Sequence, residues 1–319
     1  MAEFKVVITA RSFGKADEKA YDCLKASGCR WIKLEETNES IDGQLKREIV
    51  DADALIAGLE DIGADVIGEA KKLKVISRYG VGYDKVDIEA ARKKGIQVTI
   101  TPGANGDSVA DLAVALMLDV ARNVTIMDGA IKGRNQKRPQ GLEMFEKTLG
   151  VIGAGRIGQG VAKRCRGFSM NVLAYDVFED ERFKQETGAH YVDLNQLLRE
   201  SDFITIHSPL TEETKHMIST AQFKMMKPEA IIVNTARGGV IDEAALYEAL
   251  KSGEIRGAGL DATVDEPPYD SPLMNCENCI LTPHAGAATK EASSKMSLMA
   301  AQNAVEVLNG KECKFNVAK

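Results

Sequence analysis

The sequence is poor in three things: cysteine, long apolar runs and positive charge. Six cysteines in 319 residues do not make a disulfide framework. No apolar run reaches the ~18 residues of a membrane span, and the first residues, M-A-E-F-K-V-V-I-T, lead into a strand pattern without a signal peptide. A net charge of -6 argues against a nucleic-acid partner, because phosphate binding requires a basic face. We therefore expect a cytoplasmic protein with neither membrane nor nucleic acid as partner.

Two of the cysteines, Cys276 and Cys279, form a C-x-x-C pair in a stretch that reads as a loop. A zinc site would need a second pair or two histidines, and a redox pair normally begins a helix of a thioredoxin-like unit. Neither context is present, so we expect two reduced loop thiols and no metal. The remaining composition, 44% hydrophobic and 28% charged, is ordinary for a globular protein, and the length suits two domains.

The most informative stretch runs from 149 to 176. An apolar run ends in glycines at 153, 155 and 158, a helix-compatible segment follows, and a second apolar run ends at Asp176. In a dinucleotide site Gly153 permits the tight turn, Gly155 lets the backbone approach the pyrophosphate, and Gly158 lets the helix pack on the strand. An acid at the end of the second strand accepts bonds from the ribose hydroxyls and repels a 2′-phosphate, which favours NAD over NADP. The alternative is a glycine-rich turn without a ligand.

Residues 4–101 alternate strand and helix patterns. The expected strands are 4–9, 31–34, 54–57, 73–77 and 96–100, with helices at 15–26, 43–50, 64–71 and 87–94. Such alternation builds a parallel sheet with helices on both faces. The loop R-Y-G-V-G-Y-D-K-V-D follows a strand end, where open α/β sheets bind ligands, so Val81 and Gly82 could offer N–H groups to a carboxylate. The two glycines of this loop could equally serve only the turn.

A long helix begins after T-P-G-A-N-G, with Asp107 or Ser108 as its cap. We expect the chain to cross there into a second domain. The basic segment 132–140 reads as a surface loop, although Arg134 or Arg138 could reach an anionic ligand. A last helix near 288–309 is expected to pack back on the first domain. The expected domains are therefore 1–103 with 288–319, which would bind substrate, and 104–287, which would bind NAD.

Four later strands, 203–206, 230–234, 258–261 and 280–282, are each followed by polar residues. The helical patterns between them lie near 194–200, 218–226 and 242–252. Carboxyl ends of parallel strands meet at one edge of a sheet, so these residues should lie together beside the dinucleotide. The polar segments are H-S-P at 207–209, T-A-R-G-G at 235–239, D-A-T-V-D-E-P-P at 261–268 and P-H-A-G at 283–286.

Three of these residues describe a redox site for 2-hydroxy or 2-oxo acids. His284 suits proton transfer because imidazole titrates near neutral pH. A carboxylate such as Glu266 on the other ring nitrogen would fix its tautomer and favour the imidazolium. Arg237 can bind a substrate carboxylate with two hydrogen bonds. The other histidines, 190, 207 and 216, are interpreted as structural, although His207 and Ser208 could line the cofactor.

The segments G-A-G-R-I-G, N-T-A-R-G-G-V-I-D-E, G-L-D-A-T-V-D-E-P-P and L-T-P-H-A-G-A-A-T together resemble the NAD-dependent D-2-hydroxyacid dehydrogenase family. So do G-V-G-Y-D-K-V-D and the S-V-A-D-L helix start, and the likeness covers nearly the whole chain. The resemblance implies an α/β fold in which a Rossmann nucleotide-binding domain is inserted in a flavodoxin-like substrate domain, both doubly wound. It also implies NAD as cofactor and a homodimer joined through the nucleotide domains and the helix after residue 106.

The resemblance assigns roles to individual residues. Arg237 would bind the substrate carboxylate, and Glu266 and His284 would form the acid/base pair. The substrate would contact Arg78, Val81, Gly82, Arg237 and His284. The cofactor would contact Ser108, Gly153, Gly155, Arg156, Ile157, Gly158, Asp176, His207, Ser208, Pro209, Thr235, Ala236, Arg237, Asp261, His284, Ala285, Gly286 and Ala287.

Within the family the chain is most similar to members that oxidise D-3-phosphoglycerate in serine biosynthesis. The likeness has departures: the loop A-G-L-E-D at 57–61 lacks an arginine that such members often carry, and a C-terminal serine-sensing domain is not present. Arg78 stands at a second basic position, and Arg134 could assist from a partner subunit. Glyoxylate, hydroxypyruvate or another 2-oxo acid is therefore an open alternative. A different class, NADH-sensing corepressor-like binding proteins, shares the fold, but its long disordered tails are missing here.

Overall fold

The computed structural model describes residues 3–319, and its chain divides into two compact units. The first unit is Met1–Asn105 with Ala287–Lys319, and the second is Gly106–Gly286. The crossings differ slightly from the expected ones, because Ala104 and Ala287 pack with Ala292 and Met296 in a small apolar cluster of the first unit. Ala287 thus belongs to the first unit rather than to the nucleotide-binding one. No helix within residues 3–319 combines the length and apolarity needed to cross a membrane.

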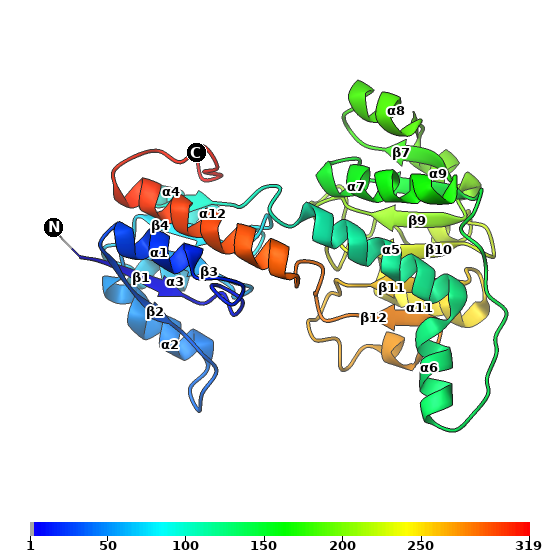
Figure 1. The fold of residues 1–319 in the computed structure, drawn as a ribbon, viewed down its shortest axis with the longest axis horizontal. Coiled ribbons are helices and arrows are strands. Elements are labelled where there is room, and N and C mark those ends of the chain that lie inside the picture. The colour runs from blue at the N-terminus through cyan, green and yellow to red at the C-terminus, as the bar shows by residue number, and fades with distance from the viewer. Residues whose placement is uncertain (1–2) are drawn as a thin grey trace. The chain divides into compact units, whose positions relative to one another are not determined.

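The first unit has a five-stranded parallel sheet in the order β2-β1-β3-β4-β5 (Figure 1). Its strands are β1 (Phe4–Ile8), β2 (Cys29–Lys33), β3 (Ala54–Ala57), β4 (Val75–Arg78) and β5 (Gln97–Thr99). Its helices are α1 (Lys19–Ala26), α2 (Ile41–Glu48), α3 (Ala64–Glu69), α4 (Ile88–Lys93) and α12 (Lys290–Leu308). The core on one face includes residues of α1 and α12, and the core on the other includes residues of α2, α3 and α4. The sheet is therefore covered on both sides, as a flavodoxin-like order requires.

The second unit has a seven-stranded parallel sheet in the order β12-β11-β10-β9-β6-β7-β8. The strands are β6 (Thr148–Ile152), β7 (Asn171–Tyr175), β8 (His190–Tyr191), β9 (Phe203–Ile206), β10 (Ile231–Asn234), β11 (Gly257–Leu260) and β12 (Cys279–Leu281). The helices are α5 (Gly106–Arg122), α6 (Val124–Lys132), α7 (Arg156–Cys165), α8 (Glu181–Thr187), α9 (Leu194–Glu200), α10 (Thr220–Phe223) and α11 (Glu243–Ser252). The chain order reverses between β6 and β9, which makes the carboxyl ends of these strands the expected ligand crevice of a Rossmann fold.

Local chemistry explains most of the element boundaries. The central strands are almost continuous apolar runs because both faces of the sheet are buried. Side-chain oxygens of Ser40, Asp87, Asp180, Asp193, Asp242 and Thr289 accept N–H bonds at helix starts. Three elements were not expected from the sequence: α6, α8 and the short β8. Helix α5 also begins one residue before the expected cap, and it ends where Asn123 adopts a left-handed φ of 54°.

The prediction of two loop thiols was only half right. Both cysteines are free. Cys276 lies in the loop between β11 and β12, directly after a short 3₁₀ turn. Cys279, however, is the first residue of β12 and is buried. Burial raises the pKa of its thiol to about 12, so it stays protonated and unreactive at neutral pH.

Candidate active site

The three glycines after β6 have the three local environments that a dinucleotide turn requires. Gly153 adopts a φ of 90°, and a Cβ there would lie 2.7 Å from the His207 carbonyl carbon. A Cβ on Gly155 would meet nothing within 4 Å, whereas one on Gly158 would collide with the Gly153 carbonyl. Next to Gly155, at the start of α7, there is therefore open space. At Gly158, by contrast, α7 packs tightly on β6.

The N-terminus of α7 and Asp176 complete the features expected of a nucleotide site. Gly155 is the N-cap of α7 and supplies no side-chain bond to the first N–H groups, which leaves that end suited to an anion. Asp176 follows β7, and its Oδ2 accepts from Ala154 N at 2.7 Å while Oδ1 accepts from Phe178 N at 3.1 Å. Each carboxylate oxygen retains acceptor capacity for a ribose hydroxyl. The carboxylate is thus anchored beside the turn that would hold the pyrophosphate.

Further expected cofactor residues of this unit lie in the first turns of α5 and α7 and directly after β9. Arg156 is exposed and Ile157 half-buried in the first turn of α7, and Ser108 is buried in the first turn of α5. Ser208 is half-buried and Pro209 exposed directly after β9. Donors, open space and an acid at the expected places fit NAD, which these residues would hold.

His207 is neutral and fixed between two hydroxyl groups. The Thr205 hydroxyl lies 2.8 Å from its Nε2, and the Thr235 hydroxyl lies 3.4 Å from its Nδ1. Burial lowers the pKa of His207 to about 3, so it carries no charge at physiological pH. This histidine can line the crevice, but it cannot serve there as a proton donor at neutral pH. His190 and His216 are exposed elsewhere on the second unit.

Asp261 organises the turn that carries His284. Its buried carboxylate accepts hydrogen bonds from Thr282 Oγ1 at 2.6 Å, Ala285 N at 2.6 Å and Gly286 N at 2.8 Å. Within this turn His284 adopts a left-handed φ of 50°, a conformation that a residue other than glycine enters at a cost. The bonds to Asp261 from both sides of His284 hold that backbone in place. Asp261, which the resemblance placed at the cofactor, is thus observed to fix the turn of His284.

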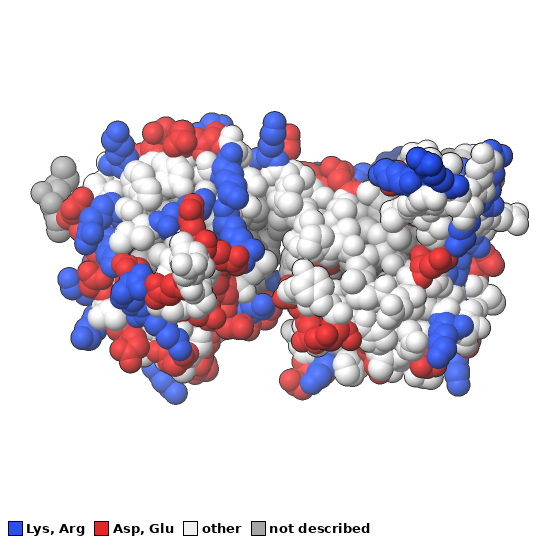
Figure 2. Space-filling model, turned by 90° about the horizontal axis from the view of Figure 1, so that it is seen from below, with Lys and Arg blue, Asp and Glu red and all other residues white. Residues whose placement is uncertain are grey.

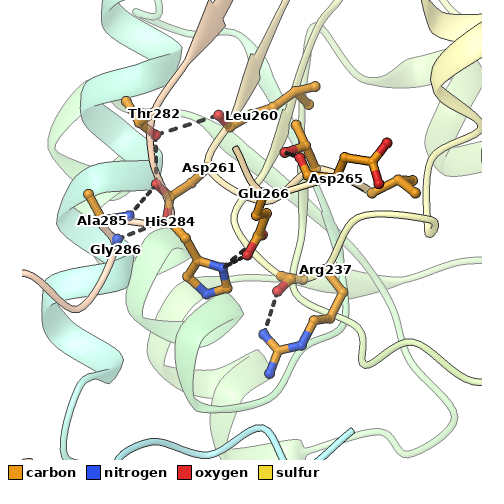
Figure 3. A network of polar contacts seen from close by, with 12 residues as sticks. Arg237, Leu260, Asp261, Asp265, Glu266, Thr282, His284, Ala285 and Gly286 are labelled. Carbon is orange, nitrogen blue, oxygen red and sulfur yellow. Dashed lines mark hydrogen bonds and ion pairs between the residues drawn. The ribbon is translucent and has the colours of Figure 1, made fainter. Parts of the chain in front are cut away.

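His284 and Glu266 form the pair that the sequence predicts. Nδ1 of His284 lies 2.9 Å from Oε1 and 3.0 Å from Oε2 of Glu266, and both side chains are 25% exposed. Figure 3 shows the Glu266 carboxylate facing the His284 ring, with Arg237 in the same view. Because Nδ1 is engaged by the carboxylate, Nε2 is the ring nitrogen left to exchange a proton with a substrate.

Arg237 lies in the turn after β10, and Asn234, the last residue of that strand, holds the turn by two hydrogen bonds. Asn234 Nδ2 donates to the Arg237 carbonyl at 2.7 Å, and Asn234 Oδ1 accepts from Ala236 N at 3.0 Å. The guanidinium donates through Nη1 to the Ala236 carbonyl at 2.7 Å (Figure 3). A guanidinium has five N–H donors in a planar fork, and this geometry matches the two oxygens of a carboxylate. Sequence reasoning missed Asn234 and Thr282; a polar residue at each strand end was the available signal.

The expected substrate residues of the first unit lie at the carboxyl edge of its own sheet. Arg78, the last residue of β4, is buried, and its guanidinium donates to the carbonyls of Gly58 and, at 3.1 Å, of Gly82. It therefore joins the loop after β3 to the loop after β4. Val81 is exposed and Gly82 half-buried in the second of these loops.

A parallel sheet with a dinucleotide turn, a histidine–carboxylate pair and a neighbouring arginine defines a nucleotide-dependent oxidoreductase of small carboxylic acids. Residues 114–286 match the family model described as D-isomer specific 2-hydroxyacid dehydrogenase, NAD binding domain. The chain belongs to this family.

Known proteins support the same membership. The chain is 48% identical over 272 residues to a D-3-phosphoglycerate dehydrogenase of Methanocaldococcus jannaschii, an alignment covering 84% of this chain but only 52% of that protein. It is 46% identical over 270 residues to a glyoxylate reductase of Korarchaeum cryptofilum, covering 82% and 81% of the two chains. The chain is also similar to a crystal structure of D-lactate dehydrogenase with NAD+ from Lactobacillus jensenii. The superposition covers 99% of this chain and 100% of that chain, with a TM-score of 0.78 and 27% sequence identity.

Proposed function

We propose that the protein interconverts a D-2-hydroxy acid and its 2-oxo acid with NAD. The observation that carries this proposal is the His284–Glu266 contact beside Arg237, on adjoining strand ends of the sheet that carries the dinucleotide turn. NAD, when bound, supplies or accepts the hydride at its nicotinamide ring. The protein's own residues supply orientation and the proton.

Each of the three side chains has one task in this reaction. Arg237 binds the substrate carboxylate with two parallel hydrogen bonds and so orients the adjacent carbon. In the reductive direction His284 donates a proton from Nε2 to the carbonyl oxygen, and in the oxidative direction Nε2 takes the hydroxyl proton. Glu266 keeps Nδ1 protonated and offsets the positive charge of the imidazolium.

For the substrate, the loop after β3 favours an unphosphorylated acid. The half-buried Glu60 occupies this loop, and its Oε2 is buried without a hydrogen-bond partner in the described chain. Its carboxylate lies against Gly58, whose carbonyl accepts from Arg78. An unpaired carboxylate here would repel a substrate phosphate. We therefore favour glyoxylate or hydroxypyruvate as the substrate over 3-phosphohydroxypyruvate, which the sequence analysis favoured. The phosphorylated acid is the second candidate, because the chain is 48% identical in sequence to a D-3-phosphoglycerate dehydrogenase.

The test compares hydroxypyruvate with 3-phosphohydroxypyruvate, which differ only by the phosphate. With NADH we expect kcat/KM to be higher for hydroxypyruvate, and Glu60→Gln should raise the value for the phosphorylated acid selectively. A wild-type preference of ~100-fold or more for the phosphorylated acid would contradict this assignment and restore phosphoglycerate as the substrate. NADH binding without turnover of any 2-oxo acid would instead support the sensor reading.

We also propose a homodimer in which a second copy covers α6. None of the residues of α6 is buried, and Val124 and Ile131 are 52% and 62% exposed. Phe145, in the segment that follows, is 55% exposed. In Figure 2 the second unit, at the right of the view, shows broad areas without charged residues. Sedimentation equilibrium should give twice the mass of one chain, and Ile131→Lys should shift it to one; a monomeric wild type would contradict the proposal.

A further inference from the structure

Glu266 is carried by a segment without regular structure, so something outside that segment must hold it. The segment follows β11, and its first part, residues 263–265, leads directly to Glu266. Thr263 is buried, and its hydroxyl donates to the Asp265 carbonyl at 2.8 Å, which closes a small turn. This bond shapes the turn internally but does not attach it to the sheet.

Two neighbours attach it. The first is Gly238, the residue after Arg237, where a Cβ would collide with the Thr263 carbonyl group and the Val264 nitrogen. The backbone of the Glu266 segment therefore lies directly on the backbone of the Arg237 turn. This close approach is possible only because residue 238 has no side chain.

The second neighbour is Glu243, the first residue of α11. Its Oε1 accepts a hydrogen bond from Val264 N at 2.7 Å. The helix start that presents it is itself fixed, because the N-cap Asp242 accepts from Ala245 N at 3.2 Å and from the Ser219 hydroxyl at 2.9 Å. The side chain of Val264 is 59% exposed, so the backbone, not the side chain, determines where this residue lies.

We propose that Glu243 is a positioning residue for the acid/base pair, because its carboxylate holds the Val264 N–H and so keeps the segment of Glu266 seated on the Arg237 turn. The proposal rests on the proposed function of Glu266 and His284. It gives α11 a task in the site although this helix contributes no group to the substrate.

The carboxyl group of Glu243 interacts with two other acidic side chains, those of Asp265 and Glu266. Burial raises the pKa of Glu243, the Val264 N–H lowers it, and the carboxylates of Asp265 and Glu266 raise it further. Another titratable neighbour is Cys279 of β12, and the charge of Glu243 helps to raise the pKa of its thiol. An ionised Glu243 adds negative potential near Asp265 and Glu266. Its charge and its acceptor oxygen are therefore two separable contributions.

Two variants separate them. Glu243→Ala removes both the acceptor and the charge, whereas Glu243→Gln keeps an acceptor oxygen for Val264 N and removes only the charge. Glu248→Ala, an exposed glutamate of the same helix, is the matched control. We expect Glu243→Ala to lower kcat for the 2-oxo acid by ~10-fold or more with an NADH dissociation constant changed less than about twofold. Glu243→Gln should regain most of this kcat, because its side-chain oxygen can still accept from Val264 N.

A readout independent of turnover tests the same contact. Hydrogen exchange of the Val264 amide should be faster in Glu243→Ala and near the wild-type rate in Glu243→Gln and Glu248→Ala. Should the alanine variant not fold, Glu243→Asp, whose carboxylate is one methylene shorter, tests the same contact through the same amide exchange.

Unchanged amide exchange and unchanged kcat in Glu243→Ala would overturn the proposal, as would a loss in Glu243→Gln as large as in Glu243→Ala. A wild type without activity toward any 2-oxo acid would refute the proposed function instead. In that case the amide exchange alone decides whether Glu243 holds the segment.

Discussion

Nδ1 of His284 lies 2.9 Å and 3.0 Å from the two carboxylate oxygens of Glu266, and Asp261 holds the turn around His284 by three hydrogen bonds. The imidazole is therefore oriented from two directions, by its own ring nitrogen and by its backbone. Such orientation keeps Nε2 in one place for proton transfer.

Replacement of Glu266 by glutamine should leave the contact and remove the charge. The imidazolium that forms during proton transfer then loses its counter-charge. We expect kcat/KM for reduction to drop by ~10- to 100-fold. Glu277→Gln, at a glutamate with a 75% exposed side chain, is the control. A kcat/KM equal to that of the wild type would exclude Glu266 from the acid/base pair.

Replacement of Arg237 should separate substrate orientation from cofactor binding. Arg237→Ala is expected to lower kcat/KM by ~1000-fold or more while NADH binding is mostly retained, since the fork would contact the substrate carboxylate. Arg237→Lys should recover only a small part, because an ammonium group cannot make the two parallel bonds. NADH fluorescence titration and steady-state kinetics measure the two effects. An NADH affinity that falls as much as kcat/KM would contradict the assignment.

Gly155 and Gly158 offer a matched pair of substitutions in one motif. Gly155→Ala adds a methyl group to open space at an extended φ of -72°, so the fold should be unaffected while NADH affinity falls by ~10-fold or more. Gly158→Ala forces α7 away from β6 and should destabilise the second unit by about 1–3 kcal/mol. Thermal unfolding and NADH titration of both variants test this. Equal destabilisation by the two alanines would argue that no ligand space exists above Gly155.

His207 should remain neutral while the protein is folded. The unfolded chain takes up a proton on this histidine near pH 6.5, whereas burial keeps the pKa of His207 in the folded protein at about 3. The folded state therefore binds fewer protons in this window, and it loses up to ~1.4 kcal/mol of stability per pH unit as the pH falls from about 6.5 towards 3. NMR titration of the His207 ring from about pH 8 to 5 should show no protonation of the folded protein in buffer. In concentrated urea the ring of the unfolded chain should become protonated with a midpoint near pH 6.5. Protonation near pH 6.5 in the native protein would contradict this prediction.

The sequence predicted the elements whose signals are local. Apolar runs marked the central strands because parallel strands are buried on both faces, and glycine and acid spacing marked the nucleotide turn. The helices α6 and α8 and strand β8 were missed, since α8 and β8 are short and α6 follows α5 after a single residue, Asn123.

The site was predictable only as a set of strand-end residues. That His284 and Glu266 touch follows from the pairing of β11 with β12, which the sequence implies only as a sheet edge. The three bonds of Asp261, the Asn234 bonds under Arg237 and the Glu243 bond to Val264 depend on atomic positions that no spacing rule specifies. These contacts join residues 2 to 25 positions apart, so they hold the site together across several segments of the chain.

The most direct test of the account is oxidation of D-glycerate and L-glycerate by the purified protein with NAD+ and with NADP+. We expect turnover of the D-isomer with NAD+, at a kcat/KM at least ~100-fold above that of the L-isomer, because Arg237 and His284 fix the carboxylate and the hydroxyl on one face of the nicotinamide. NADP+ should be used poorly, because Asp176 would repel its 2′-phosphate. Equal turnover of both isomers, or none of either, would contradict the proposed dehydrogenase site.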